Sequence, residues 1–393
     1  MKIVFIEDSN LMGGVQYSTL YLSKQFIETR KNIEVLILIP GEGPFTEICN
    51  QSLIPYKTYK STNYLSSSLS FFNDNIRIPN IFAWIYNILI MIINSRRIGY
   101  YLNKINIDIV ITKGLLNHIS TGIACKRLKI PIVWHLQDLI GRHYFGLLRI
   151  IFNYCAKKIP QKIICDGSLI KDSLSSSLRK KTKVILNGIE SKKLNFDIKA
   201  RNFIRNEFNI PSNAYLIGHL ARITPWKGQK ILLDAFIEYA KINKHAYLIL
   251  IGSPLFSDFD YLNKLKKMIK NHKLESRVVL TGFRTDLKEL FSAMDVFVYP
   301  SVKKDTSPLA LLSAICFGLP VIVSNISSLK EILDICPSVD SFSINNKDEL
   351  ILLLKKHEDP IIRKETGNNN KIFGQERFDI VRHANKMYKY LNL

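Results

Sequence analysis

The stretch GHLARITPWKGQKILLDAF, from Gly218 to Phe236, places a strand end, a polar loop and a helix in direct succession. The residues Tyr215–His219 form a short apolar run with the length of a buried strand. Arg222 and Lys227 follow in the loop, Gly228 turns the chain, and an amphipathic helical pattern begins. A strand followed at once by a helix is half of a βαβ unit, so this stretch predicts a parallel sheet.

Short apolar runs recur on both sides of this stretch, and helical patterns separate them. Runs that are apolar throughout are typical of strands that helices cover on both faces, as in a parallel sheet. The predicted strands are Ile3–Ile6, Ile33–Ile39, Ile107–Thr112, Ile130–His135 and Lys162–Cys165, and then Tyr215–His219, Ala246–Ile251, Val278–Thr281, Val296–Tyr299 and Val321–Val323. The pattern occurs twice, which predicts an α/β protein with two Rossmann-like parallel-sheet domains.

The length of 393 residues also favours two domains, because one hydrophobic core rarely grows so large. The motif VILNGIE (Val184–Glu190) and the polar stretch Ser191–Ala200 fall between the two series of strands, as the end of a strand and a linker would. We therefore expect a first domain over residues 1–186, a linker over 187–200, a second domain over 201–374 and a C-terminal helical segment over 375–393.

The net charge of +22 is unevenly distributed. Residues 51–190 contain 20 Lys and Arg against 6 Asp and Glu, a local excess of +14. Such an excess favours an anionic partner, which is a membrane surface, a nucleic acid or a phosphorylated substrate. The alternative is a solvated Lys-rich surface, since net charge informs on association and not on fold. The sequence contains no recognised nucleic-acid-binding motif, so we expect no nucleic-acid partner.

The cysteines and the N-terminus indicate a reducing compartment. Six cysteines are scattered, with no CxxC motif and no cluster with histidine, and we expect buried thiols and no structural metal. They are Cys49, Cys125, Cys155, Cys165, Cys316 and Cys336. The opening residues MKIVFI lead directly into a strand and lack the layout of a signal peptide. We therefore expect a cytoplasmic protein.

The segment Asn80–Lys104 is the most apolar helical pattern in the chain. Between Ile81 and Ile93 only Asn87 is polar, a span of 13 residues, which is shorter than the roughly 20 residues that cross a bilayer. The asparagines at 80, 87 and 94 would form one narrow polar stripe. We expect a nearly fully buried helix, because apolar helices of large proteins usually pack in cores. The alternative is a helix that rests in a membrane interface, flanked by Arg96 and Arg97.

The stretch KKDTSPLALLSAICFGLPVIVS, residues 303–324, predicts a helix with a well-defined start. Ser307 suits an N-cap and Pro308 the first helical position. The free N–H groups of Leu309 and Ala310 would then point out of the helix start, where a phosphate can bind.

Two loops that follow strands carry candidate ligand-binding residues. Gly13 and Gly14 stand between the first strand and a helix, where they allow close approach of a ligand and a positive φ, although a tight turn explains them equally well. The G-x-G-x-x-G fingerprint of dinucleotide binding is missing here. Arg222 and Lys227, five residues apart after a parallel strand, can hold a diphosphate, the alternative being two solvated surface cations.

Taken together, these motifs resemble the retaining glycosyltransferases of family 4, whose GT-B fold has two Rossmann-like domains facing a central cleft. The resemblance covers nearly the whole chain in the order of the family, loosely in the first half and specifically in the second. The matching pieces are GGVQ, VWHLQD (Val133–Asp138), LNGIE, ARITPWKGQ, LILIGSP (Leu248–Pro254), VVLTGFRTDLKELFSAMDVFVYPS (Val278–Ser301) and the stretch from 303 to 324.

The resemblance implies a nucleotide-diphospho-sugar donor bound mainly by the second domain. Arg222 and Lys227 would hold the diphosphate and stabilise the leaving group, and Asp305 would face the transferred sugar. His135 would contact a sugar hydroxyl, and Asp138 could orient His135 or the neighbouring loops. The further donor-binding positions are Gly13, Gly14, Gly252, Ser307, Leu309, Ala310 and Ser313.

Ser313 departs from the family, which usually has Glu at this position to grip the ribose of the nucleotide. A serine makes one uncharged hydrogen bond, worth roughly 0.5–1.5 kcal/mol, in place of a charge-assisted one of about 1.5–3 kcal/mol. The departure puts donor affinity in doubt. It also leaves open a second function, that of a non-catalytic partner of another transferase, although Arg222, Lys227 and Asp305 are present.

The expected function is therefore transfer of a sugar, with retention of configuration, to a glycan or lipid-linked acceptor in the synthesis of surface polysaccharide or lipopolysaccharide. The resemblance implies no cofactor and no metal, since Arg, Lys and helix N–H groups can supply the positive charge. The basic excess in residues 51–190 suits a peripheral contact with an anionic membrane. The final helical segment would cross back and pack on the first domain.

Overall fold

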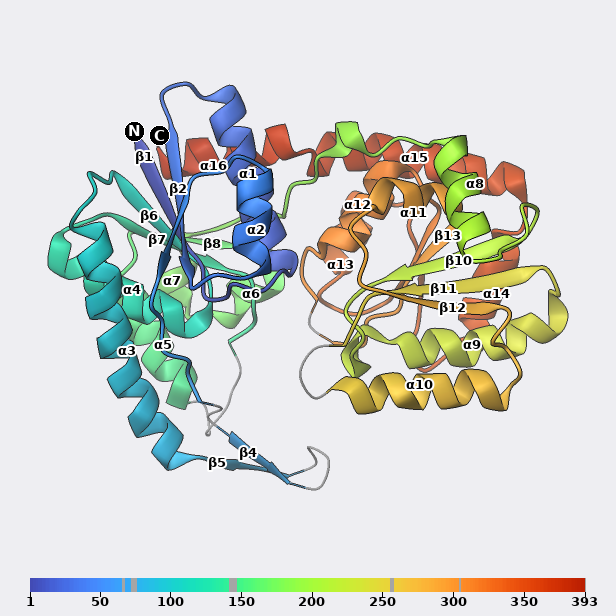
Figure 1. Ribbon diagram of the computed structural model, residues 1–393, viewed down its shortest axis with the longest axis horizontal. Coiled ribbons are helices and arrows are strands. Elements are labelled where there is room, and N and C mark those ends of the chain that lie inside the picture. Colours follow the sequence, from blue (N-terminus) through green and yellow to red (C-terminus); the bar gives the residue numbers. More distant parts are fainter. Residues whose placement is uncertain (66–67, 72–75, 141–146, 255–257, 304, 393) are drawn as a thin grey trace. The chain divides into compact units, whose positions relative to one another are not determined.

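The computed structural model describes residues 1–65, 68–71, 76–140, 147–254, 258–303 and 305–392 of the chain. They form two compact units (Figure 1). The first unit comprises Met1–Leu186 and His383–Leu393, and the second comprises Asn187–Arg382. Each unit is a parallel sheet covered by helices, so the predicted α/β architecture with two Rossmann-like domains is confirmed.

The sheet of the first unit has seven parallel strands in the order β3-β2-β1-β6-β7-β8-β9. The strand order reverses between β1 and β6, the switch point at whose carboxyl side ligands bind in open α/β sheets. The strands are β1 (Lys2–Ile6), β2 (Glu34–Pro40), β3 (Tyr56–Tyr59), β6 (Ile109–Thr112), β7 (Ile132–Leu136), β8 (Lys162–Cys165) and β9 (Thr182–Val184), and a separate antiparallel hairpin is formed by β4 (Ser68–Phe71) and β5 (Ile76–Pro79).

Helices cover both faces of this sheet because its central strands are apolar on both sides. The side chains of α1, α2 and α16 pack on one face, and those of α3 to α7 pack on the other (Figure 1). The helices are α1 (Gly14–Thr29), α2 (Pro44–Gln51), α3 (Ile81–Leu102), α4 (Leu115–Leu128), α5 (Leu147–Lys158), α6 (Ser168–Ser173), α7 (Ser176–Arg179) and α16 (Ile380–Leu391).

The sheet of the second unit has six parallel strands in the order β12-β11-β10-β13-β14-β15. Its switch point lies between β10 and β13. The strands are β10 (Tyr215–Leu220), β11 (Ala246–Ile251), β12 (Val278–Gly282), β13 (Val296–Tyr299), β14 (Val321–Ser324) and β15 (Asp340–Phe342).

The helices of the second unit also lie on both faces, with α9, α10 and α14 sharing one core with the strands. Two short 3₁₀ helices, η2 (Ser191–Lys193) and η3 (Pro225–Lys227), accompany them. The α-helices are α8 (Ile198–Glu207), α9 (Gln229–Ile242), α10 (Phe259–Asn271), α11 (Leu287–Ala293), α12 (Leu309–Phe317), α13 (Lys330–Ile335), α14 (Lys347–Lys356) and α15 (Pro360–Phe378).

All ten predicted strands are present, with ends that shift by one or two residues. The prediction missed the edge strands β3 and β15 and the hairpin of β4 and β5, and of the edge strand β9 it gave only the end, at Val184. The sequence of β3 is YKTY, and β9 and β15 have three residues each, so none of these three shows the long apolar run of a central strand. Edge strands have a partner on one side only, and they tolerate polar side chains and short lengths.

The residues predicted as a linker, 187–200, lie within the second unit. The backbone N–H of Asn187 donates to Ser307 Oγ over 2.7 Å, and Ile189 N–H donates to the carbonyl of Phe378. The residues from His383 onward lie in the first unit, where His383 Nδ1 is 2.8 Å from the carbonyl of Leu186. The structure therefore differs from the predicted linker: the chain passes between the units at residues 186–187 and again at 382–383, because long-range hydrogen bonds hold residues 187–200 in place.

The prediction of a nearly fully buried helix at 80–104 is wrong. The helix α3 runs from Ile81 to Leu102, and only 33% of its most apolar window is buried. By length and composition it is a helix that could cross a membrane. The expected polar stripe is present, with Asn87 and Asn94 buried.

The six cysteines are free, as expected from their spacing. Five are buried and Cys155 is half-buried. Burial raises the pKa of Cys49, Cys125 and Cys336 to about 12, so these thiols stay protonated at neutral pH.

Candidate active site

The loop that follows β10 lies against the loop that follows β13, at the switch point of the second sheet. The N–H of Val302 donates to the carbonyl of Trp226 over 2.9 Å, and Ser301 Oγ lies 3.1 Å from the same carbonyl oxygen. Gly228 makes this contact possible, since it has φ +75° and an added Cβ would lie 1.8 Å from the carbonyl oxygen of Pro300. The close approach places Lys227 next to residues that follow β13.

The ammonium of Lys227 is paired with the carboxylate of Asp305. Lys227 Nζ lies 2.5 Å from Asp305 Oδ2 and 2.6 Å from the hydroxyl of Tyr299. The same carboxylate oxygen accepts from the Tyr299 hydroxyl over 2.6 Å and from Ser301 Oγ over 2.9 Å. The backbone N–H of Asp305 donates to Ser328 Oγ over 3.0 Å, which fixes the start of this loop.

Burial governs the electrostatics of this pair. It lowers the pKa of Lys227 below the usual value, while the charge of Asp305 acts in the opposite direction. The Lys227 ammonium also lies 4.2 Å from the centre of the Trp226 ring, a cation–π contact. An ammonium has three N–H groups and two are used by Tyr299 and Asp305, so one remains to donate to a ligand.

Arg222 lies beside this pair, at the start of the same loop. Its side chain is exposed, its guanidinium is 5.8 Å from the ring of Trp226, and its charge lowers the pKa of Lys227. The structure therefore brings Arg222, Lys227 and Asp305 together at one end of the second sheet. Because Asp305 offsets the charge of Lys227, Arg222 gives the group its net positive charge.

The start of α12 differs in detail from the prediction. Ser307 is not the N-cap: it has φ +50°, and its hydroxyl accepts from the backbone of Asn187. Pro308 occupies the N-cap position and the helix begins at Leu309. Because the Ser307 hydroxyl accepts from the backbone N–H of Asn187, it does not cap α12. The first-turn N–H groups of Leu309 and Ala310 still lack acceptors within the helix, as at any helix start.

Two further donor-binding candidates are buried backbone or core positions. Ser313 lies in α12 and is 3% exposed. Gly252 follows β11 with φ +137°, and an added Cβ would lie 2.0 Å from the carbonyl oxygen of Ala221. This glycine therefore lets the chain after β11 pass close to the start of the loop that carries Arg222.

The first unit places His135 within β7 and not on the surface. The side chain is 1% exposed, and Nε2 lies 2.5 Å from Asp166 Oδ1. The carboxylate in contact with His135 is thus Asp166, which follows β8, and not Asp138. Gln137 Nε2 donates to Asp166 Oδ2 over 2.8 Å. Burial alone would raise the pKa of Asp166, but His135, Lys113 and Gln137 together outweigh this effect and the pKa is lowered.

A second buried cluster surrounds the end of β1, and the sequence analysis missed it. The carboxylate of Glu7 accepts from Thr19 Oγ1 over 2.5 Å and from Gln16 Nε2 over 3.1 Å. Lys113 Nζ donates to Ser18 Oγ over 2.5 Å. Burial raises the pKa of Glu7 to about 7, and the charge of Lys113 opposes this effect. The available signal was a charged residue directly after a buried strand, at Glu7 after β1 and at Lys113 after β6.

The glycines of the first loop are Gly13, at the N-cap of α1, and Gly14, its first residue. Neither has the positive φ that the sequence suggested, and Gly13 is extended at φ −157°. An added Cβ on Gly14 would meet nothing within 4 Å. Open space above this backbone is what close approach of a ligand requires.

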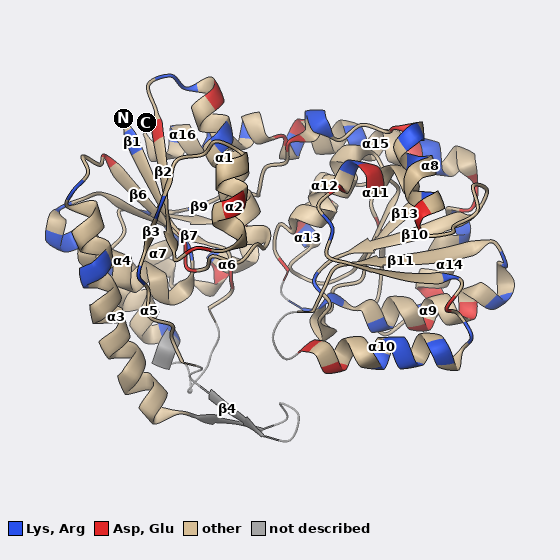
Figure 2. Cartoon of the chain, in the orientation of Figure 1, with Lys and Arg blue, Asp and Glu red and all other residues tan. Residues whose placement is uncertain are grey.

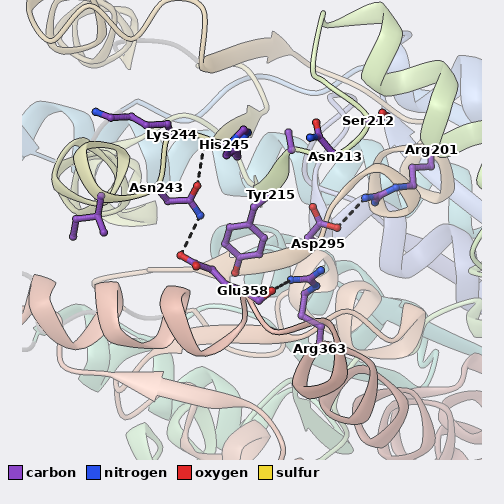
Figure 3. Close-up of a pocket in the computed structure, with 12 residues that line it drawn as sticks. Arg201, Ser212, Asn213, Tyr215, Asn243, Lys244, His245, Asp295, Glu358 and Arg363 are labelled. Carbon is purple, nitrogen blue, oxygen red and sulfur yellow. Dashed lines mark hydrogen bonds and ion pairs between the residues drawn. The ribbon is translucent and has the colours of Figure 1, made fainter.

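The second unit also has a polar pocket of about 760 Å³ at the other end of its sheet, where the strands begin (Figure 3). Tyr215 at the first residue of β10 and Asp295 just before β13 contribute to its lining. Its charged side chains contact one another, as in the pair of Arg201 with Asp295. Ligands of open α/β sheets bind at the carboxyl ends of strands, so the group around Lys227 remains the candidate site.

The chemistry of this group suits an anion with several oxygens. One guanidinium, one ammonium and the first turn of α12 supply donors, and a diphosphate presents acceptors in matching number. Within the part of the chain that the structure describes, no three His, Cys, Asp or Glu side chains gather as a metal site.

Family models match both units of the chain. The model described as glycosyltransferase family 4 matches residues 12–193, and the model described as glycosyl transferases group 1 matches residues 200–356. Together they cover nearly all of the chain between residues 12 and 356.

Individual relatives are similar at low identity. The O-antigen biosynthesis glycosyltransferase WclY of Escherichia coli is 29% identical over 184 residues, which are 45% of this chain and 47% of that protein, so the match spans about half the length of this relative. The UDP-Gal:alpha-D-GlcNAc-diphosphoundecaprenol alpha-1,3-galactosyltransferase of Escherichia coli is 26% identical over 405 residues, covering 98% of this chain and 95% of that protein.

A solved structure shares the fold over the full length. The crystal structure of Anabaena Alr3699/HepE in complex with UDP and glucose has a TM-score of 0.84 at 21% identity, and it covers 100% of this chain and 99% of that chain. Two parallel sheets in Rossmann order, the two family models and this structural likeness agree, and the chain belongs to the group 1 and family 4 glycosyltransferases of the GT-B fold.

Proposed function

We propose that this glycosyltransferase moves a hexose from a UDP-sugar to a glycan or lipid-linked acceptor, with retention of configuration, in the synthesis of a cell-surface polysaccharide. The names of two similar proteins support the donor: one is a galactosyltransferase that uses UDP-Gal, and the other was crystallised with UDP and glucose. The name of the O-antigen enzyme and that of the diphosphoundecaprenol galactosyltransferase support the acceptor class.

The observation that carries this proposal is the group formed by Arg222, Lys227 and Asp305. The remaining N–H of Lys227 and the fork of Arg222 would hold the diphosphate, and they would stabilise the charge that develops on the leaving phosphate. Asp305, held by Tyr299 and Ser301, would face the transferred sugar. These cations supply the positive charge, so the proposal assigns no role to a metal ion.

The first unit would bind the acceptor. His135 is buried against Asp166, so in this proposal it orients the polar residues at the end of β7 rather than reaching the bulk solvent itself. The free thiols of the cysteines favour a cytoplasmic location, where they stay reduced.

Donor binding is tested by thermal unfolding with UDP-, GDP- and ADP-sugars. At 100 times its dissociation constant a ligand stabilises the folded state by about 2.7 kcal/mol, which raises Tm by roughly 5–10 °C for a unit of this size. We expect this shift with a UDP-hexose. A flat response to all the nucleotide sugars would refute the proposed donor class.

Turnover is measured separately, as release of the nucleoside diphosphate in the presence of membranes that carry candidate acceptors. Binding of a nucleotide sugar without turnover on any acceptor would favour the non-catalytic partner role over the transferase.

The substitution Ser313→Glu tests the ribose contact. Because Ser313 is almost fully buried, an unpaired glutamate there is expected to lower the stability of the ligand-free protein. If the ribose lies against this residue, the charge-assisted bond should tighten UDP binding by about 1 kcal/mol, or roughly fivefold in Kd by calorimetry. Weaker or unchanged binding by folded Ser313→Glu would show that the ribose lies elsewhere.

A further inference from the structure

The outward face of α3 is apolar over its first thirteen residues. The exposed fractions are 69% for Ile81, 86% for Phe82 and 57% for Ile85. The exposed residues continue along the same side of the helix. They are Tyr86, Ile88, Leu89, Ile92 and Ile93. An exposed apolar patch of this extent on a single helix marks an interaction surface.

The asparagines of α3 face the protein, the reverse of a helix on the surface of a soluble domain. Asn87 exchanges two hydrogen bonds with the backbone of Leu65, over 2.8 and 2.9 Å. Asn94 does the same with Thr62, both over 3.0 Å. Asn80 caps the helix by accepting from the N–H of Ala83. These contacts fix the rotation of α3, so its apolar side cannot turn inward without leaving backbone groups unpaired.

Three of the five helices on this side of the sheet, α3, α4 and α5, carry charge of one sign. The sequences of α3, α4 and α5 contain seven Lys and Arg residues and no Asp or Glu (Figure 2). The basic residues are Arg96, Arg97, Lys126, Arg127, Arg149, Lys157 and Lys158. Exposed apolar side chains accompany them on the neighbouring helices, at Ile123 of α4 and at Ile150 and Tyr154 of α5.

The helix does not have the environment of a membrane span. Ile90, Ile98 and Leu102 are buried, and the last two belong to a core that they share with α4 and with the sheet. The guanidinium of Arg127 on α4 lies close to Gly99, where an added Cβ would be 2.6 Å from it. One side of α3 therefore packs on protein along its length, so lipid can cover only the other side.

We propose that α3 is a membrane-docking helix, whose face from Ile81 to Ile93 enters the boundary between headgroups and acyl chains of an anionic bilayer. Arg96, Lys126 and Arg127 would contact the lipid phosphates. Apolar side chains at the surface with basic residues beside them are the combination that an anionic interface binds. This inference does not depend on the proposed donor or acceptor, because membrane binding is measured without either.

A second copy of the chain suits this surface less well. A symmetric dimer through α3 would bring the same patch of both copies together, and the basic residues beside it would face basic residues without a partner. Negatively charged lipid neutralises them instead.

The test is flotation of the full chain with vesicles of phosphatidylcholine alone and with 30 to 40% phosphatidylglycerol, at low and high salt. We expect binding to the anionic vesicles that weakens with salt. The triple substitution Phe82→Gln, Ile85→Gln and Leu89→Gln should weaken it at least tenfold, with Tm unchanged because these side chains are already exposed. Lys126→Gln with Arg127→Gln should weaken binding on the order of fivefold per residue.

The matched control is Ile198→Gln, Phe203→Gln and Ile361→Gln in the second unit, which removes three side chains of similar exposure. It should bind vesicles as the wild type does. Equal binding to neutral and anionic vesicles, or equal loss in both triple variants, would overturn the proposal. So would a dimer in sedimentation equilibrium that the Phe82 triple variant dissociates while vesicle binding is absent.

Discussion

Lys227→Ala is expected to reduce turnover by about two to three orders of magnitude, the effect of removing one preorganised donor to developing negative charge. In the structure the ammonium lies between Asp305 and Tyr299 with one N–H left over, and the substitution removes this donor. The substitution also leaves the buried carboxylate without its counterion. Two hydroxyl donors remain on that carboxylate, so the loss of stability should stay below about 3 kcal/mol.

Lys230→Ala is the matched control for this prediction. Lys230 lies three residues further on, with an exposed side chain that pairs with Asp234 on the surface of α9. Exposed pairs of this kind contribute little, so both turnover and Tm should stay near the wild-type values. Nucleoside diphosphate release and calorimetric donor affinity are measured at a temperature where circular dichroism shows every variant folded. Near-normal turnover by folded Lys227→Ala would remove the central support of the proposed mechanism.

Gly228→Ala is expected to destabilise the second unit by more than about 3 kcal/mol and to lower turnover with it. A methyl group here would lie 1.8 Å from the carbonyl oxygen of Pro300, and φ is +75°. The obstacle is backbone, which cannot rotate away as a side chain can. The loop that carries Lys227 would have to move, and the contact of Trp226 with Val302 would be lost.

Gly282→Ala separates the two components of this effect. Gly282 has the same φ of +75°, but an added Cβ would meet only Ser253 Oγ, at 3.8 Å. This variant should show the positive-φ penalty alone, about 1 kcal/mol. Urea unfolding measures both variants. If they lose equal stability, contact with Pro300 is not what makes Gly228 necessary.

Much of the fold was predictable because buried parallel strands are apolar along their whole length. The ten predicted strands, which include the edge strand β12, have this local property, and the edge strands β3, β9 and β15 do not. The residues of the candidate site were predictable, but their contacts were not. Arg222 and Lys227 follow a strand directly, and Asp305 lies in a motif of its own. The pairing of Lys227 with Asp305, with Tyr299 and Ser301 on the same carboxylate oxygen, joins residues up to 78 positions apart, and a local pattern does not reveal it.

The contacts of His135 and of α3 were also not predictable from a local sequence pattern. The motif around His135 drew attention to Asp138, three residues away, whereas the partner in the structure is Asp166 from the next strand. In α3 the spacing of the asparagines showed a polar stripe, and the usual rule would turn that stripe to water. In the structure the backbone N–H groups of Thr62 and Leu65 donate to Asn94 and Asn87, so the polar stripe faces the protein.

The amino-acid sequence alone determined two parallel sheets with helices on both faces, and a basic loop after the first strand of the second sheet. These features follow from hydrophobic periodicity and loop chemistry, which act over a few residues. Only the tertiary structure decided which charge meets which and which side of α3 remains exposed. Such choices depend on contacts between distant segments, where each buried polar group must find a partner.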